Sequence, residues 1–240
     1  MQVPLQLLAR KNLRYADAAR LLCYSPPYGK MRKLAVGLSA ECLRADLDAL
    51  AAREPRLAAA IARIGYPAPR IRPRGYQTLL RTIVGQQVSV AAAASMWRKL
   101  EAELGDNFTP HCLLARDFET LRACGLSRQK QAYARSLCEL VAAGAIDFDA
   151  LPADDEEAIA LLTRIKGIGR WSAEIYLLFA EGRRDIWPAG DLAVQEGLRR
   201  LLDLPERPAE KATRALAEPW SPRRGSMAIF TWHFYANPAL

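Results

Sequence analysis

The stretch Leu162-Thr163-Arg164-Ile165-Lys166-Gly167-Ile168-Gly169-Arg170-Trp171-Ser172-Ala173 contains two glycines between apolar residues at helical spacing. Glycine tolerates backbone conformations that end a helix, so one helix is expected to end at Ile165 and another to begin at Arg170 or Trp171. The N–H groups at the start of a helix lack partners within it, and the positive end of the helix dipole lies behind them. The stretch therefore predicts a hairpin that binds a phosphate. The alternative is a tight helical hairpin whose glycines serve only packing.

Five residues of the hairpin are candidates for phosphate contact. The glycines Gly167 and Gly169 let a phosphate approach the backbone, Ser172 adds a hydroxyl, and Lys166 and Arg170 add positive charge.

A second feature follows at Pro188-Ala189-Gly190-Asp191, where an aspartate stands directly before an expected helix. Aspartate is a preferred N-cap, which is the structural interpretation. A capping position also fixes a carboxylate at the mouth of a helix, so Asp191 is a candidate catalytic group as well. The hairpin and the aspartate together suggest an enzyme that works on a base in DNA.

Composition favours a helical protein with a basic surface. Half of the 240 residues are hydrophobic and 25% are charged, with glycine and proline confined to short interruptions, which predicts an all-α fold. Lys and Arg number 34 against 26 Asp and Glu, and the net charge of +8 comes mostly from arginine. Arginine suits phosphate binding, although a GC-rich genome produces the same bias.

The cysteines and the apolar runs indicate the compartment. The five cysteines show no Cys-x-x-Cys pair and no histidine at ligand spacing, so they are expected to be reduced and mostly buried. The apolar runs are too short to span a bilayer, so we expect a cytoplasmic protein, nucleoid-associated in a bacterium, with no membrane partner.

Apolar periodicity predicts a series of helices after an N-terminal extension, residues 1–38, to which no function is assigned. Caps are expected at Ser89, Ser127 and Asp155, and Pro67–Gly75 is a predicted linker. The expected helices are 43–51, 57–64, 76–85, 90–104, 110–123, 127–143, 155–165, 170–180, 191–202, 208–217 and 224–235.

Four segments together resemble the bacterial DNA-3-methyladenine glycosylase II group, within the helix-hairpin-helix DNA glycosylases. They are 81–90, 125–127, 166–173 and 220–224, and the similarity covers roughly residues 39–235. The resemblance implies a two-lobed all-α fold with the active-site cleft between the lobes. Residues 39–75 and 189–240 are expected to form one lobe, and residues 76–188 the lobe that carries the hairpin.

The resemblance implies a monofunctional glycosylase of base excision repair. Such an enzyme hydrolyses the N-glycosidic bond of alkylated purines, 3-methyladenine and 7-methylguanine, in double-stranded DNA and leaves an abasic site. Asp191 is the implied catalytic residue, because a carboxylate stabilises positive charge on the sugar and orients or deprotonates water. Relatives that also cut the backbone carry a lysine at the position of Trp171, so no lyase activity is expected. The alternatives are a glycosylase for another damaged purine and a non-catalytic binder of DNA structures.

The resemblance also assigns the remaining site residues. Gln87 is the implied wedge that enters the duplex. Arg223 and Arg224 are implied phosphate contacts, with a solvated helix end as the alternative. No redox cofactor is implied, although the main-chain carbonyls of Ile165 and Ile168 are candidate ligands of a structural monovalent cation.

The base pocket is expected to be aromatic and apolar, because an alkylated purine is electron-poor and stacks on indole. The implied pocket residues are Trp171, Trp232, Tyr176 and Ile175. Core packing is the alternative for each tryptophan, and we expect it for Trp187 and Trp220. The expected partner is double-stranded DNA with damaged bases, and the protein is expected to be a monomer.

Overall fold

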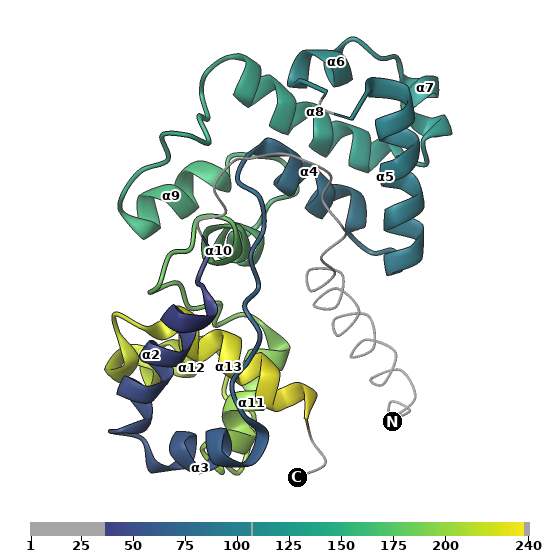
Figure 1. The fold of residues 1–240 in the computed structure, drawn as a ribbon. Coiled ribbons are helices and arrows are strands. Elements are labelled where there is room, and N and C mark those ends of the chain that lie inside the picture. The colour runs from purple at the N-terminus through teal and green to yellow at the C-terminus, as the bar shows by residue number, and fades with distance from the viewer. Residues whose placement is uncertain (1–36, 107, 238–240) are drawn as a thin grey trace, which may run out of the picture. The chain divides into compact units, whose positions relative to one another are not determined.

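The computed structural model describes residues 37–106 and 108–237, and every regular element within these ranges is helical (Figure 1). The predicted all-α class is therefore confirmed for this part of the chain. None of these helices is long and apolar enough to cross a bilayer.

The described residues fall into two compact units. The first unit takes them from Arg74–Ser172, and its helix α8 packs against α4, α6 and α7. Its core includes the fully buried side chains of Leu79, Ile83 and Leu137. Its helices are α4 (Tyr76–Gly85), α5 (Val90–Leu104), α6 (Pro110–Leu114), α7 (Phe118–Ala123), α8 (Arg128–Ala142) and α9 (Asp155–Leu162).

The second unit combines the described parts of Lys33–Pro73 and Ala173–Leu240. Helix α13 packs against α11 and α2, and Met227 and Phe230 of α13 are fully buried. Its elements are α2 (Ala40–Ala51), α3 (Pro55–Ile64), α11 (Leu192–Leu201), α12 (Glu210–Ala217), the 3-10 turn η1 (Glu218–Trp220) and α13 (Arg224–Ala236).

The boundary between the units lies inside helix α10 (Arg170–Phe179), between Ser172 and Ala173. The expected boundary at residue 188 thus differs from the observed one, and residues 173–188 belong to the second unit. The reason is packing: the Phe179 ring lies 5.6 Å from the Trp232 ring, and Phe179 O accepts a hydrogen bond from Arg72 N at 2.9 Å. Residues 1–36 of the predicted extension lie outside the described residues.

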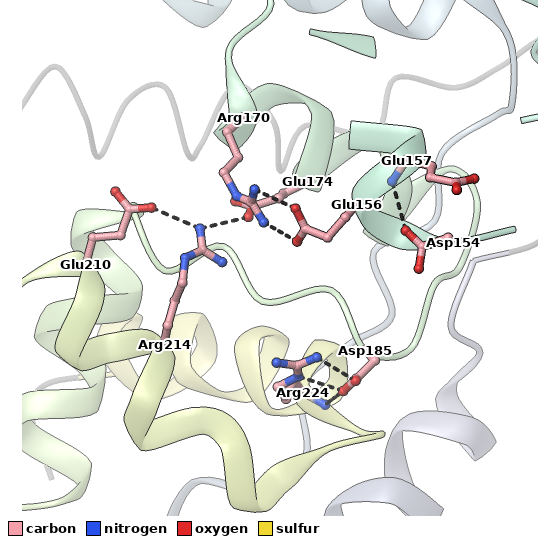
Figure 2. Close-up of polar contacts among 9 residues, drawn as sticks. All are labelled: Asp154, Glu156, Glu157, Arg170, Glu174, Asp185, Glu210, Arg214 and Arg224. Carbon is pink, nitrogen blue, oxygen red and sulfur yellow. Dashed lines mark hydrogen bonds and ion pairs between the residues drawn. The ribbon is translucent and has the colours of Figure 1, made fainter. Parts of the chain in front are cut away.

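Local capping explains most helix starts. The Ser89 hydroxyl accepts a hydrogen bond from Ala92 N at 3.2 Å, and the Ser127 hydroxyl accepts one from Lys130 N at 3.3 Å, so both predicted caps are confirmed. The cap of α9 is Asp154 and not Asp155, since the Asp154 carboxylate accepts a hydrogen bond from Glu157 N (Figure 2). Helix α9 ends at Leu162 rather than Ile165.

The expected single helix 110–123 is wrong, because the chain forms two short helices there. Asp117 caps the second of them by accepting a hydrogen bond from Thr120 N at 2.8 Å. The Arg135 guanidinium on α8 donates to the carbonyls of Leu114 and Arg116, which satisfies the end of the first.

The described cysteines are free thiols, but only Cys124 and Cys138 are buried. Cys42 is exposed and Cys112 is half-buried, so the expectation of mostly buried thiols is only half right. Burial raises the pKa of the Cys138 thiol to about 12, which makes it an unreactive core side chain. Cys23 lies outside the described residues.

The contact between α11 and α13 depends on Gly197. A Cβ at this position would lie 2.7 Å from the backbone oxygen of Thr231, which cannot move without shifting α13. We expect Gly197→Ala to lower the free energy of unfolding by about 1–3 kcal/mol in urea denaturation followed by circular dichroism. Helix propensity alone would raise stability by about 1 kcal/mol, so a more stable variant would contradict this packing.

Candidate active site and phosphate-binding hairpin

The hairpin between α9 and α10 closes through a tight turn at Gly167. Ile168 N donates to Ile165 O at 3.0 Å, and Gly167 has a φ of 81° in the left-handed region. A Cβ on Gly167 would lie only 2.2 Å from the Tyr133 ring on α8. Both backbone conformation and packing therefore require glycine at this position.

Gly169 behaves differently from Gly167. Its φ lies outside the left-handed region, and among the described residues no atom apart from its own chain neighbours lies within 4 Å of a Cβ built on it. The backbone conformation therefore does not require glycine here, whereas glycine was expected at both positions for the backbone conformations that it tolerates. The missing side chain leaves open space directly before the first residue of α10.

Side chains from two other elements hold the hairpin loop. The Ser136 hydroxyl on α8 accepts a hydrogen bond from Lys166 N at 3.1 Å, and the Gln86 amide donates from Nε2 to Gly167 O at 2.8 Å. Sequence reasoning missed both partners, because Gln86 and Gly167 are 81 residues apart and nothing local marks the pair.

The predicted phosphate contacts of the hairpin differ in their surroundings. Lys166 is exposed and Ser172 is buried. Arg170 forms a two-bond ion pair with Glu156, one bond measuring 2.8 Å (Figure 2). A phosphate at the start of α10 would compete with Glu156 for Arg170, so the backbone and Lys166 are the more accessible donors.

Arg223 and Arg224 are both engaged by carboxylates of the second unit. Arg224 donates to Asp185 at 2.8 and 2.7 Å (Figure 2), and Arg223 forms an ion pair with the buried Asp46 at 3.3 Å. These pairs hold the start of α13, where Gly225 N donates to Arg184 O at 2.7 Å. The structure therefore gives both arginines a structural partner, and their contact with phosphate stays a prediction.

Asp191 caps α11 and is 3% exposed. Its Oδ1 atom accepts hydrogen bonds from Ala193 N at 2.8 Å, Val194 N at 3.0 Å and Trp232 Nε1 at 3.1 Å. Three N–H donors and the positive end of a helix thus face one carboxylate oxygen, an arrangement suited to negative charge. The N-cap interpretation is confirmed, and it is compatible with a catalytic role.

The turn before Asp191 is held by side chains that the sequence did not reveal as supports. The Gln195 amide donates to Ala189 O at 2.8 Å, and Trp187 Nε1 donates to Thr213 O at 3.0 Å. Trp187 also packs edge-on against Trp220 with ring centroids 5.6 Å apart, so the expectation of core packing for both is confirmed. Gln195 is a polar residue on the buried face of the first turn of α11. A polar residue in such a place is the sequence pattern that could have predicted this support.

Three of the four predicted pocket residues are buried in the second unit. Trp232 is 4% exposed, Ile175 is 3% exposed, and Tyr176 is 2% exposed with its hydroxyl 3.1 Å from a Glu181 carboxylate oxygen. Trp171, in the first turn of α10, is half-buried. Their contact with a base stays a prediction, but Trp232 acquires a role that sequence reasoning missed, as a donor to Asp191.

A further buried carboxylate was also missed. Glu174 on α10 is 2% exposed and is paired with Arg214 on α12 at 3.1 Å, and Arg214 also reaches Glu210 at 2.9 Å (Figure 2). The network ties α10 to α12 within the second unit.

The candidate cation site at the hairpin has carbonyls that are partly used. Ile165 O accepts the hydrogen bond from Ile168 N, which leaves one of its two lone pairs for another partner. Binding of a monovalent cation at the carbonyls of Ile165 and Ile168 stays a prediction.

A family model for the HhH-GPD superfamily of base excision DNA repair proteins matches residues 80–222. This span includes Gln87, the hairpin and Asp191. The chain belongs to this superfamily.

Relatives within the superfamily support the assignment. DNA-3-methyladenine glycosylase 1 of Schizosaccharomyces pombe is 35% identical over 161 residues, which are 65% of this chain and 71% of the relative. The crystal structure of the Bacillus halodurans DNA-3-methyladenine glycosidase matches with a TM-score of 0.73 and 31% identity, over 81% of this chain and 90% of that one. The S. pombe 3-methyladenine DNA glycosylase in complex with abasic DNA matches with a TM-score of 0.69 and 30% identity, over 82% and 97%.

The two hairpin glycines are expected to respond differently to substitution. Gly167→Ala should lose about 2 kcal/mol or more of unfolding free energy, because the Cβ meets Tyr133 and the left-handed backbone resists a side chain. Gly169→Ala should stay within about 1 kcal/mol of the wild type, since its Cβ enters open space. Chemical denaturation of both variants measures the difference, and equal losses would show that Gly169 is also required by the fold.

Proposed function

We propose that this HhH-GPD protein is a monofunctional DNA glycosylase that releases alkylated purines, 3-methyladenine and 7-methylguanine, from double-stranded DNA. The observation that carries the proposal is the Asp191 carboxylate, held at the start of α11 by three N–H donors. The names of the relatives, which are 3-methyladenine glycosylases, support the substrate class. Its cytoplasmic location and monomeric state stay predictions.

DNA binding is assigned to the start of α10. The open space at Gly169 lets a phosphate oxygen approach the backbone N–H groups of the first helical turn, where the helix dipole is positive. The exposed Lys166 adds a cation beside it. Contacts of this kind read no base, so the hairpin sets the register of the protein on DNA of any sequence.

Base release is assigned to Asp191. Cleavage of the N-glycosidic bond builds positive charge on the deoxyribose, and an ionised carboxylate stabilises that charge. The same carboxylate orients or deprotonates the water that attacks the sugar carbon. The hydrogen bond from Trp232 and the two backbone bonds keep the carboxylate in one orientation, so little reorganisation is needed during the reaction.

The alkylated purine supplies the rest of the driving force. Methylation at N3 or N7 makes the base cationic, so the base departs as a neutral molecule without protonation by the protein. A strong general acid is therefore unnecessary. Trp171 is assigned to the base pocket, where an indole face attracts an electron-poor purine. Gln87 is assigned to the duplex gap that the extruded base leaves.

Replacing the carboxylate tests the chemistry. Asp191→Asn keeps an oxygen that caps α11 but removes the negative charge, so base release in single turnover should fall about a hundredfold or more. DNA affinity and stability should be retained. Release of methylpurines from DNA treated with a methylating agent is measured by chromatography.

The matched control is Asp117→Asn, which changes another N-cap aspartate, that of α7. It should leave base release unchanged. A wild-type protein that binds DNA but releases no methylpurine would contradict the proposed substrate, and unchanged release by Asp191→Asn would contradict the assigned residue.

The absence of lyase activity is tested by borohydride. A lyase attacks the sugar with an amine and forms an imine that borohydride reduces to a stable protein–DNA adduct. Trp171 has no amine, so we expect no adduct during turnover on methylated DNA, measured by denaturing electrophoresis. A glycosylase with lyase activity serves as the positive control, and an adduct with this protein would overturn the monofunctional assignment.

A further inference from the structure

The turn between α4 and α5 is joined directly to the hairpin within the first unit. Gln86 lies in this turn, and its Nε2 atom donates to Gly167 O at 2.8 Å. The next residue, Gln87, is exposed. Its backbone φ of 57° lies in the left-handed region, which residues other than glycine rarely adopt. A conformation of this kind persists only where neighbouring contacts hold it, and Gln86 makes such a contact.

One face of helix α8 supports the same two segments. Lys130, Tyr133 and Ser136 follow one another at three-residue spacing, which places them on one side of the helix. Lys130 donates from Nζ to Val84 O at 2.6 Å in the last turn of α4, just before the Gln86 turn. Tyr133 packs against Gly167, and Ser136 accepts from the N–H of Lys166.

Lys130 is half-buried, and this burial lowers the pKa of its ammonium group. A cation placed at the end of α4 also meets the negative end of that helix dipole. The α4 end, the Gln86 turn and the hairpin loop are thus attached to one another and to one helix, through contacts of backbone carbonyls and amides.

We infer that Gln86 is a positioning residue, which fixes the Gln87 turn to the hairpin so that a phosphate held at the start of α10 determines where Gln87 enters the duplex. The inference rests on the proposed function. Gln86 acts through Gln87 and need not touch DNA itself. The hydrogen bond between Gln86 and Gly167 matters because Gln87 must enter the duplex at a fixed distance from the phosphate that is bound at the start of α10.

The variants that test the link are Gln86→Ala and Gln86→Glu. Gln86→Glu keeps the shape of the side chain but replaces the N–H donor with an oxygen that faces the oxygen of Gly167. The matched control is Gln77→Glu: Gln77 lies on the same helix, α4, and donates from Nε2 to Phe108 O at 3.1 Å, far along the helix from the turn. Gln86→Glu and Gln77→Glu each lose one amide-to-carbonyl hydrogen bond, but only the bond of Gln86 reaches the hairpin.

Hydrogen–deuterium exchange of the protein without DNA tests whether the link exists. In Gln86→Glu, backbone amides in 85–89 and in 166–169 should exchange faster than in the wild type. In Gln77→Glu, both segments should exchange at wild-type rates. Unchanged exchange at the hairpin in Gln86→Glu would overturn the inference, whatever the enzyme does to DNA.

Kinetics test whether the link positions Gln87. In single turnover at saturating methylated DNA, Gln86→Ala should release methylpurines about fivefold more slowly, the loss expected for one hydrogen bond. Its affinity for undamaged duplex should stay within about twofold of the wild type, because the hairpin N–H groups are kept. A loss of affinity with an unchanged rate would overturn the positioning role.

A double-mutant cycle separates positioning from general destabilisation. Once Gln87→Ala has removed the inserting side chain, adding Gln86→Ala should change the rate by less than about twofold, whereas independent effects would multiply. Multiplying effects would overturn the inference. If the wild-type protein releases no methylpurine, the proposed function fails, while hydrogen exchange still decides the link between Gln86 and Gly167.

Discussion

A single carboxylate oxygen organises the start of α11, where the proposal places the reaction. Oδ1 of Asp191 accepts two backbone N–H groups of α11 and the indole N–H of Trp232 on α13. The same bonds that start the helix also fix the direction of the carboxylate, and the Gln195 amide holds the turn that precedes it. Folding of the second unit therefore prepares the charge that the proposed reaction needs, before any substrate is present. In a buried position such preparation is worth more than in water, since few mobile dipoles compete with it.

The two glycines of the hairpin serve different purposes: one is required by the fold, and the other leaves space for the proposed phosphate. Gly167 serves the fold, because Tyr133 occupies the space of its side chain and its backbone is left-handed. A Cβ on Gly169 would meet no other part of the described residues beyond its chain neighbours, and the proposal uses this open space for a phosphate. The arginine side chains contribute less to the proposed phosphate binding than the sequence suggests. Arg170, Arg223 and Arg224 all have carboxylate partners, which leaves the backbone N–H groups as the main phosphate donors in the proposal.

Sequence reasoning succeeded where structure depends on neighbours along the chain. Ser89 and Ser127 were predicted as caps because a hydroxyl before a helix reaches an amide only three residues away. It failed where another element intervened. The helix expected over 110–123 is broken because Arg135, from α8, satisfies the carbonyls at the end of its first part. The boundary between the two units was predicted at residue 188 and lies instead within α10. The prediction failed because Phe179 packs against Trp232, a contact that no sequence pattern within α10 predicts.

The sequence by itself determined the helical class, the glycine hairpin, the capping aspartate and the family to which they belong, since each of these is written in short segments of chain. Only the tertiary structure decided what holds these segments in place. Trp232 reaches Asp191 across 41 residues, Arg214 reaches Glu174 across 40, and Gln86 reaches Gly167 across 81. The physical reason is that a hydrogen bond forms over about 3 Å in space, and distance along the chain gives no measure of that separation until the helices have packed.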